Sequence, residues 1–156
     1  MTVRYAEERD IPRIGELLRQ VCNVHAAGRP DLFVADARKY TDEQLKELLA
    51  DDTRPILVAT DAEDRVVGYA FCVMQESGAH HALQDVRTLY LDDLCVDETC
   101  RGQHIGRTLY EAVLSLARER GCYNVTLHVW NCNAAAMKFY EALGMQCRQM
   151  EMETVL

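Results

Sequence analysis

Residues 89–117 read LYLDDLCVDETCRGQHIGRTLYEAVLSLA, and this stretch decides the fold. The residues at its start are apolar and β-prone and predict a strand over 86–96. Polar residues and two glycines follow over 97–106 and indicate a loop. From Ile105 onward, apolar side chains recur at helical spacing, which predicts a helix that ends near Gly121, a suitable C-cap glycine.

The order strand, glycine-containing loop, helix is typical of a site for a pyrophosphate. Backbone N–H groups and the positive end of a helix dipole meet there. We expect Gly102 and Gly106 to permit positive φ and close approach of the ligand, while Arg101 and Arg107 add positive charge. Neither the G-x-G-x-x-G fingerprint nor the P-loop sequence is present.

Two motifs make the interpretation more specific. RGQHIG, at residues 101–106, resembles the [R/Q]-x-x-G-x-[G/A] signature of the GNAT acetyltransferases, with His104 in place of the first glycine. NAAAMKFYEALGM, at residues 133–145, resembles the N-x-x-A-x-x-F-Y-x-x-x-G-[FM] helix of the same family. The resemblance implies acetyl-CoA as co-substrate and an amine as acceptor. We expect His104 to tolerate the loop conformation and turn outward.

In the family, acetyl-CoA lies against the end of the central strand, the loop after it and the last helix. The strand backbone hydrogen-bonds the acetyl carbonyl and the pantetheine arm, and can supply oxyanion donors. The resemblance therefore implies one set of acetyl-CoA contacts: Leu94, Cys95, Val96, Arg101, Gly102, Gln103, His104, Ile105, Gly106, Arg107, Asn133, Ala136 and Tyr140.

Acetylation of an amine requires loss of a proton from the ammonium and protonation of the departing thiolate. The resemblance assigns the acid role to Tyr140; otherwise a tyrosine at this position would be read as a packing residue. The base candidates are Asp92 and Asp93, which as neighbours in a strand are expected to point to opposite faces. Asp92 falls where diamine (spermidine/spermine) acetyltransferases have a glutamate, so it ranks first, with water and a purely structural carboxylate as alternatives.

Cys95 is a weaker candidate, as a nucleophile that would take the acetyl group. Its neighbours are apolar and the sequence shows no histidine partner for it, so we favour direct attack by the amine.

Length and composition narrow the class of protein that this sequence encodes. The length of 156 residues fits one domain over residues 1–156. A net charge of −8 argues against nucleic-acid binding and is compatible with a cationic substrate. Seven cysteines without a C-x-x-C pair predict free thiols and no metal site. The apolar runs are too short to span a membrane, and the first ten residues lack the core of a signal peptide, so we expect a cytoplasmic protein.

The remaining patterns predict an α/β sandwich. Its sheet is mixed and largely antiparallel, and the family resemblance implies that its one parallel pair splays apart. The expected strands are 3–6, 55–60, 66–74, 86–96, 124–130 and 145–155, and the expected helices are 11–24, 41–49, 105–120 and 133–143. Residues 75–85, with Gly78 and the pair His80-His81, are expected to form an exposed loop.

These observations predict an acetyl-CoA-dependent N-acetyltransferase. A small cationic amine is the first expectation for the acceptor, and a protein N-terminus or lysine is the second. The alternative from another class is a catalytically silent acyl-CoA-binding module. The acceptor is expected in a cleft formed by the first two helices, residues 25–40 and residues 75–88. The apolar final segment can support a homodimer.

Overall fold

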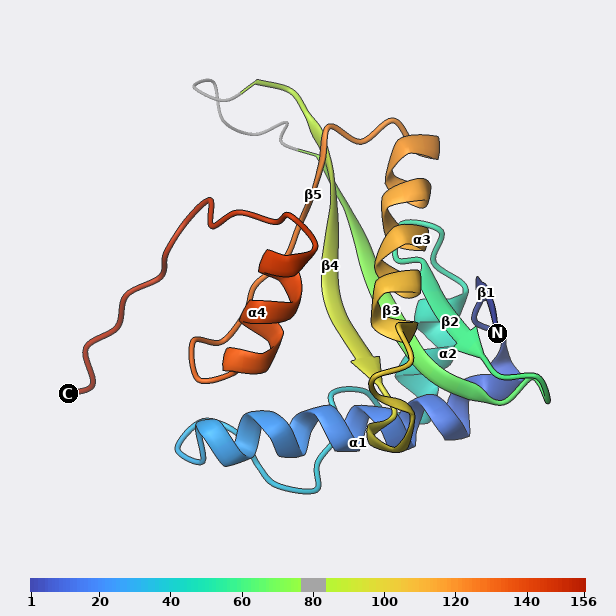
Figure 1. Ribbon diagram of the computed structural model, residues 1–156, viewed down its shortest axis with the longest axis horizontal. Helices are drawn as coiled ribbons and strands as arrows, with labels where there is room; N and C mark the ends of the chain where they lie inside the picture. The colour runs from blue at the N-terminus through green and yellow to red at the C-terminus, as the bar shows by residue number, and fades with distance from the viewer. Residues whose placement is uncertain (77–83) are drawn as a thin grey trace.

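The structure is a computed structural model, and it describes residues 1–76 and 84–156. Within these residues the centre is a five-stranded sheet in the order β1-β2-β3-β4-β5 (Figure 1). Neighbouring strands are antiparallel up to β4, while β4 and β5 are parallel. The expected mixed, largely antiparallel sheet is confirmed. The strands are β1 Thr2–Tyr5, β2 Ile56–Thr60, β3 Val66–Glu76, β4 Arg87–Val96 and β5 Asn124–Thr126.

Four helices accompany the sheet: α1 Ile11–Gly28, α2 Asp42–Leu49, α3 Ile105–Glu119 and α4 Ala134–Ala142. Pro12 lies in the first turn of α1, where its missing N–H costs nothing. Thr41 and Gln44 form a capping box at the start of α2. Helix α1 extends four residues beyond the predicted end.

The two faces of the sheet carry separate apolar clusters. On one face, α1 and α2 pack through Leu17, Leu18 and Leu45 against Tyr69 and Phe71 of β3. On the other face, α3 packs through a helical stripe that includes Leu109 and Val113 against the alternate strand residues, such as Ala70, Cys72 and Leu91. Each fully buried leucine contributes about 2 kcal/mol of burial free energy. A strand shifted by one residue would turn its apolar side chains away from their cluster and lose this contribution, so the two clusters determine which face each strand residue occupies.

The parallel pair is joined only at one end. Residues Thr88–Tyr90 pair with Asn124–Thr126, and the remainder of β4 has no partner in β5. The hydroxyl of Tyr90, the last residue of β4 that pairs with β5, lies 3.0 Å from Nδ1 of His128, two residues beyond the end of β5. Beyond this point β4 and the residues that follow β5 are no longer paired, up to the carboxyl end of β4.

Two expectations about the C-terminal third are wrong. The predicted strand 124–130 is reduced to β5, and residues 145–155 form no strand. A strand requires a neighbour to receive its backbone hydrogen bonds, and in Figure 1 the C-terminal segment runs away from the sheet. Most of the predicted loop 75–85, including Gly78, His80 and His81, lies outside the described residues.

Candidate active site

The end of β4 is fixed by a buried carboxylate. The backbone N–H of Asp97 donates to the carbonyl of Val67 at 2.9 Å. The Asp97 side chain accepts hydrogen bonds from the backbone N–H and hydroxyl of Thr99, and it is ion-paired with Arg13 of α1. Burial raises the pKa of Asp97, but the Thr99 bonds and the Arg13 charge outweigh it and the net pKa is lowered. The loop therefore starts at a residue that hydrogen bonds and an ion pair hold in place.

The loop then leads into α3 through left-handed residues. Gly102 has a φ of 79°, and His104 has a φ of 61° at the N-cap of α3. His104 is exposed and makes no capping hydrogen bond with its side chain. The N–H groups of the first turn, from Ile105 to Arg107, have no acceptor within the helix. They and the helix dipole form a site suited to an anion, with the exposed Arg101 and Arg107 beside it.

Gly106 serves a different purpose from the one expected. Its φ is not positive, because it is the second residue of α3. A Cβ at this position would lie 3.1 Å from the ring of Phe139 and 3.6 Å from Cγ2 of Val96. Gly106 thus permits close approach between the start of α3, the end of β4 and α4.

Helix α4 presents Asn133 and Tyr140 beside this contact. The Asn133 side-chain oxygen accepts a hydrogen bond from the N–H of Ala136 at 3.1 Å, so its oxygen is used as the N-cap of the helix. The partly buried Tyr140 ring lies 6.3 Å from that of Tyr110 and 5.0 Å from that of Phe139. Burial, and then the charge of Asp93, raise the pKa of Tyr140, so its hydroxyl keeps its proton at neutral pH.

The two aspartates lie at a bulge. In the β3–β4 ladder, Phe71 pairs with Asp93 and Cys72 pairs with Leu91, so Asp92 is an extra residue. Leu91 and Leu94 both pack against the α3 cluster on either side of the bulge. Asp92 and Asp93 consequently both face α1 and α2. The expectation that they point to opposite faces is wrong because the bulge breaks the alternation.

Asp92 is held in an ion pair. Its Oδ2 lies 2.7 Å from Lys39 Nζ and accepts a hydrogen bond from the Tyr40 hydroxyl at 3.2 Å. Burial lowers the pKa of Lys39, but the hydrogen bond and charge of Asp92 outweigh it and the net pKa is raised. The Asp92 carboxylate is thus already engaged by the Lys39 ammonium.

Asp93 has the environment of a proton acceptor near neutral pH. Its Oδ2 accepts a hydrogen bond from the Tyr69 hydroxyl at 2.9 Å. Burial raises the pKa of Asp93 to about 6, against the lowering effects of Tyr69 and Lys39. Because the charge of Asp93 also raises the pKa of Tyr140, the two groups interact electrostatically.

Cys95 is buried, and its thiol donates to the carbonyl of Leu17 at 3.6 Å. Burial raises the pKa of Cys95 to about 12, so almost no thiolate exists at neutral pH. This disfavours the nucleophile hypothesis.

An aromatic group joins the segment 25–40 to the chain after β5. The Phe33 ring lies 5.0 Å from His25 and 5.2 Å from Trp130. Burial lowers the pKa of His25, and the charge of Lys39 adds to this effect. The sequence pointed to residues 25–40 but not to Trp130, and its only signal would have been that this is the single tryptophan of the chain.

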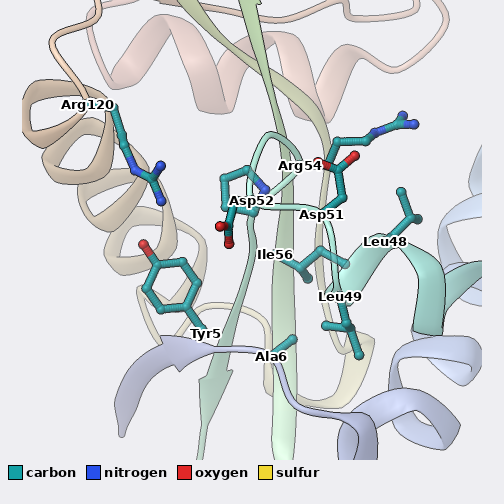
Figure 2. A pocket seen from close by; sticks show the side chains of 10 residues that line it. Tyr5, Ala6, Leu48, Leu49, Asp51, Asp52, Arg54, Ile56 and Arg120 are labelled. Atoms are coloured by element: carbon teal, nitrogen blue, oxygen red, sulfur yellow. The ribbon is translucent and has the colours of Figure 1, made fainter.

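The hollow in Figure 2 lies elsewhere, and the aspartates of β4 do not line it. It is bordered by Tyr5 of β1, Ile56 of β2 and Arg120 after α3, with Leu48 and Leu49 of α2 on its rim. Over residues 1–76 and 84–156, no group of three or more His, Cys, Asp or Glu side chains is placed to hold a metal ion. No helix in the same ranges is long and apolar enough to cross a membrane.

Comparison with known proteins places this geometry in a class. The family described as Acetyltransferase (GNAT) family matches residues 18–145, which is most of the chain, and the protein belongs to that family.

Among relatives, a probable glucosamine 6-phosphate N-acetyltransferase of Drosophila melanogaster is 28% identical over 145 residues. The match covers 92% of this chain but 60% of that protein. A putative phosphinothricin acetyltransferase of Bacillus subtilis is 27% identical over 147 residues, covering 92% of this chain and 83% of that protein. The chain therefore spans less than two thirds of the first relative.

Solved structures have the same fold over the whole length of the chain. A crystal structure of a mutant of the BH1408 protein from Bacillus halodurans has a TM-score of 0.95 at 29% identity, covering 100% of this chain and 99% of that one. An aminoglycoside N-acetyltransferase in complex with CoA shares the fold, with a TM-score of 0.73 at 16% identity and coverage of 99% and 98%.

The raised pKa of Asp93 predicts a pH-dependent stability. The pKa of the Asp93 carboxyl is near 3.8 in the unfolded chain and about 6 in the folded protein. The free energy of unfolding therefore falls by up to about 3 kcal/mol as pH rises through this window. Asp93→Asn should remove that loss. Its free energy of unfolding at pH 7.5, measured by urea denaturation, should exceed that of wild type by about 1–3 kcal/mol.

Asp92→Asn is the matched control for this effect. It leaves Lys39 partly buried without its ion pair, so it should not stabilise the protein at pH 7.5. An Asp93→Asn variant with the same pH dependence as wild type would show that Asp93 ionises normally.

Proposed function

We propose that this protein transfers the acetyl group of acetyl-CoA to a primary amine. The observation that carries the proposal is the uncapped start of α3, entered through Gly102 and His104 beside the part of β4 that has no partner in β5. The start of α3 suits the pyrophosphate, and the end of β4, which has no partner in β5, offers the backbone groups on that side to the pantetheine and the acetyl carbonyl. Family membership supports the same reading.

The proposed reaction is a direct attack. The amine nitrogen bonds to the thioester carbonyl carbon, the C–S bond breaks, and the CoA sulfur leaves with its electron pair. Tyr140 gives that sulfur a proton, which its raised pKa keeps available at neutral pH. The geometry reverses the order of the two base candidates, because Asp92 is occupied by Lys39 and Asp93 has a pKa of about 6. Asp93, directly or through water, takes one proton of the ammonium. The second proton that the nitrogen loses as the amide forms restores the Tyr140 hydroxyl through water.

The acceptor proposed is a small amine that enters beside Lys39, Asp92 and the aromatic group of His25, Phe33 and Trp130. The net charge of −8 and the Asp92 carboxylate favour a cationic amine, which would take the place of Lys39 on Asp92. A protein N-terminus or lysine is the alternative acceptor, and a catalytically silent acyl-CoA-binding module is the alternative from another class.

We propose a cytoplasmic location, because the seven cysteines of the protein are free thiols. We also propose that each chain forms one domain and that the protein acts as a homodimer.

Acetyl-CoA should raise the melting temperature of the protein, because a ligand that binds only the folded state stabilises it. Gly102→Val should abolish the shift, since a β-branched residue does not adopt a φ of 79° and the loop must rearrange. Differential scanning fluorimetry with and without acetyl-CoA measures both effects.

Gly121→Val is the matched control. Gly121 has a φ of 68° with open space around its Cβ position, as Gly102 has, but it lies at the other end of α3. It should lower the melting temperature of the free protein while keeping the acetyl-CoA shift. A full shift in Gly102→Val would place the CoA site elsewhere.

Removal of either proton-transfer group should lower kcat by ~10²–10⁴-fold without loss of acetyl-CoA affinity. Tyr140→Phe keeps the ring and removes the acid. Asp93→Asn removes the base, together with the rise in kcat/KM that wild type should show as pH increases through about 6. Release of free CoA over a panel of amines identifies the acceptor and gives these rates.

Tyr110→Phe is the control for Tyr140→Phe, because it removes a hydroxyl from the ring packed against Tyr140. It should leave kcat within about threefold, far less than a catalytic acid contributes. Equal effects at the two tyrosines would make Tyr140 a packing residue. No CoA release with any amine, despite acetyl-CoA binding, would favour the silent module.

Lys39→Met should lower KM for a cationic amine, because it frees Asp92 while retaining a long apolar side chain. The comparison is the KM of wild type and variant for a polyamine and for glucosamine 6-phosphate. A higher KM for both would contradict the cationic acceptor and indicate that Lys39 binds an anionic group of the substrate. Arg38→Met, which removes a neighbouring cation paired with Asp42, is the control and should change neither value.

A further inference from the structure

The connection between α1 and α2 brings a lysine to the candidate active site. In Figure 1 it turns back from the end of α1 and passes β4 before it enters α2. Lys39, near its end, places its Nζ 2.7 Å from Oδ2 of Asp92. The Lys39 side chain keeps 45% of its surface exposed, whereas that of Asp92 keeps 16%. The amine therefore reaches from the surface to the bulge of β4.

Tyr40, the next residue, holds Lys39 against the sheet. Its ring stacks on that of Phe71 of β3, with 5.6 Å between the centroids. Its hydroxyl donates to Asp92 at 3.2 Å. Phe71 pairs with Asp93 in the β3–β4 ladder, so this stack lies beside the bulge. Packing of the neighbouring residue thus keeps the Lys39 amine at Asp92, where an isolated surface lysine would be free to move.

Lys39 occupies the place that the proposed function gives to the amine of the acceptor. Asp93 is the proposed base, and Tyr140 is the proposed acid. Burial raises the pKa of Asp93, and the charge of Lys39 is among the effects that oppose this rise. Burial, and then the charge of Asp93, raise the pKa of Tyr140. The three groups therefore lie close enough to influence one another, and one of them is a primary amine.

We propose that Lys39 is a site of self-acetylation, where the protein transfers an acetyl group from acetyl-CoA to Nζ of its own Lys39. The transfer uses the same co-substrate, base and acid as the proposed function, on which it rests. It takes place within one chain, because the amine is paired with Asp92 of the same chain.

The chemical step follows the one proposed for a free amine. The Lys39 ammonium gives one proton to Asp93, directly or through water, and its nitrogen bonds to the thioester carbonyl carbon. The C–S bond breaks, and the CoA sulfur leaves with its electron pair and takes the proton of Tyr140. The second proton lost by the nitrogen restores the Tyr140 hydroxyl through water. The products are acetyl-lysine, CoA and one proton, which Asp93 releases to solvent.

The ion pair makes this transfer slower than the acetylation of a free amine. Burial lowers the pKa of Lys39, but the hydrogen bond and charge of Asp92 outweigh it and keep the amine protonated at neutral pH. Only an unprotonated nitrogen attacks the thioester. An acceptor amine that displaces Lys39 from Asp92 also removes it from the site. Self-acetylation is therefore a single event that is favoured when acetyl-CoA is bound and the acceptor is absent.

Acetylation of Lys39 changes the acceptor site. It removes the positive charge of the lysine, so the Asp92 carboxylate becomes available to a cationic amine. Acetylated wild type should have a lower KM for a polyamine than the unmodified protein. Lys39→Gln, whose neutral amide resembles that of acetyl-lysine, should show the same decrease. An unchanged KM after acetylation would show that the modification does not free the site.

The test is incubation of the full chain with acetyl-CoA in the absence of any amine, followed by peptide mass spectrometry. The chain has three lysines, Lys39, Lys46 and Lys138. Among the described residues, only Lys39 of the three is paired with a carboxylate. Because the ion pair disfavours the unprotonated amine, uncatalysed acetylation should modify the other two lysines at least as fast. Self-acetylation should instead add one acetyl group per chain, at Lys39, before either of the others reacts.

Two variants serve as controls. Asp93→Asn removes the base and should lower the rate at Lys39 by about 10²-fold or more, without changing the slow reaction of the other two lysines. An unchanged acetyl-CoA shift in melting temperature shows that this variant is folded and binds the co-substrate. Lys39→Arg keeps a cation for Asp92 but cannot form acetyl-lysine, so the rapidly added acetyl group should disappear from the mass spectrum.

Dilution of the protein distinguishes transfer within a chain from transfer between chains. The first-order rate constant at Lys39 should stay the same, because the amine and Asp92 belong to one chain. A rate constant that rises in proportion to protein concentration would contradict transfer within the chain. Equal labelling of the three lysines, or labelling of Lys39 that survives Asp93→Asn unchanged, would overturn self-acetylation.

The amine panel separates this inference from the proposed function. Turnover of an amine by a protein whose Lys39 stays unmodified would refute self-acetylation alone. Acetylation of Lys39 without turnover of any amine would refute the free acceptor and leave the modified lysine standing. Acetyl-CoA binding without transfer to Lys39 or to any amine would refute both.

Discussion

The extra residue in β4 is the constraint on which the candidate site depends. Without a bulge, Asp92 and Asp93 would alternate, and one carboxylate would enter the apolar layer beneath α3. The bulge lets Leu91 and Leu94 both face α3 while both carboxylates face α1 and α2. There they meet different partners, Lys39 for Asp92 and Tyr69 for Asp93. One inserted residue thus separates a paired carboxylate from a carboxylate with a raised pKa.

The contrast between the two aspartates marks the limit of prediction from sequence. The DD pair was found because carboxylates are rare within strands, and the loop and α4 were found because glycines and periodicity leave a local pattern. A bulge leaves no such pattern, since it reflects the pairing of β4 with β3. Lys39, Tyr40 and Trp130 reach the site through tertiary contacts, so their roles are invisible in the order of residues.

The same distinction explains the outcome for the fold. Strands β1 to β4 and helices α1 to α3 were predicted within a few residues because their apolar periodicity is satisfied inside the chain. Gly102 was assigned correctly as a left-handed residue, whereas Gly106 was not, because its requirement is the nearness of Phe139 from α4. The C-terminal segment has the composition of a strand, but within its own chain it has no neighbour to pair with.

The site and the C-terminal segment, residues 146–156, meet at α4. Its N-cap, Asn133, and the contact between Phe139 and Gly106 set one end of the helix against the loop and β4. Its other end leads into residues that make few contacts with the rest of the chain. The ring of Tyr140 is therefore held by Tyr110 and Phe139, while the helix that carries it has no buried residue. A catalytic acid needs a fixed position relative to the leaving sulfur, and the packing of the Tyr140 ring against Tyr110 and Phe139 supplies it.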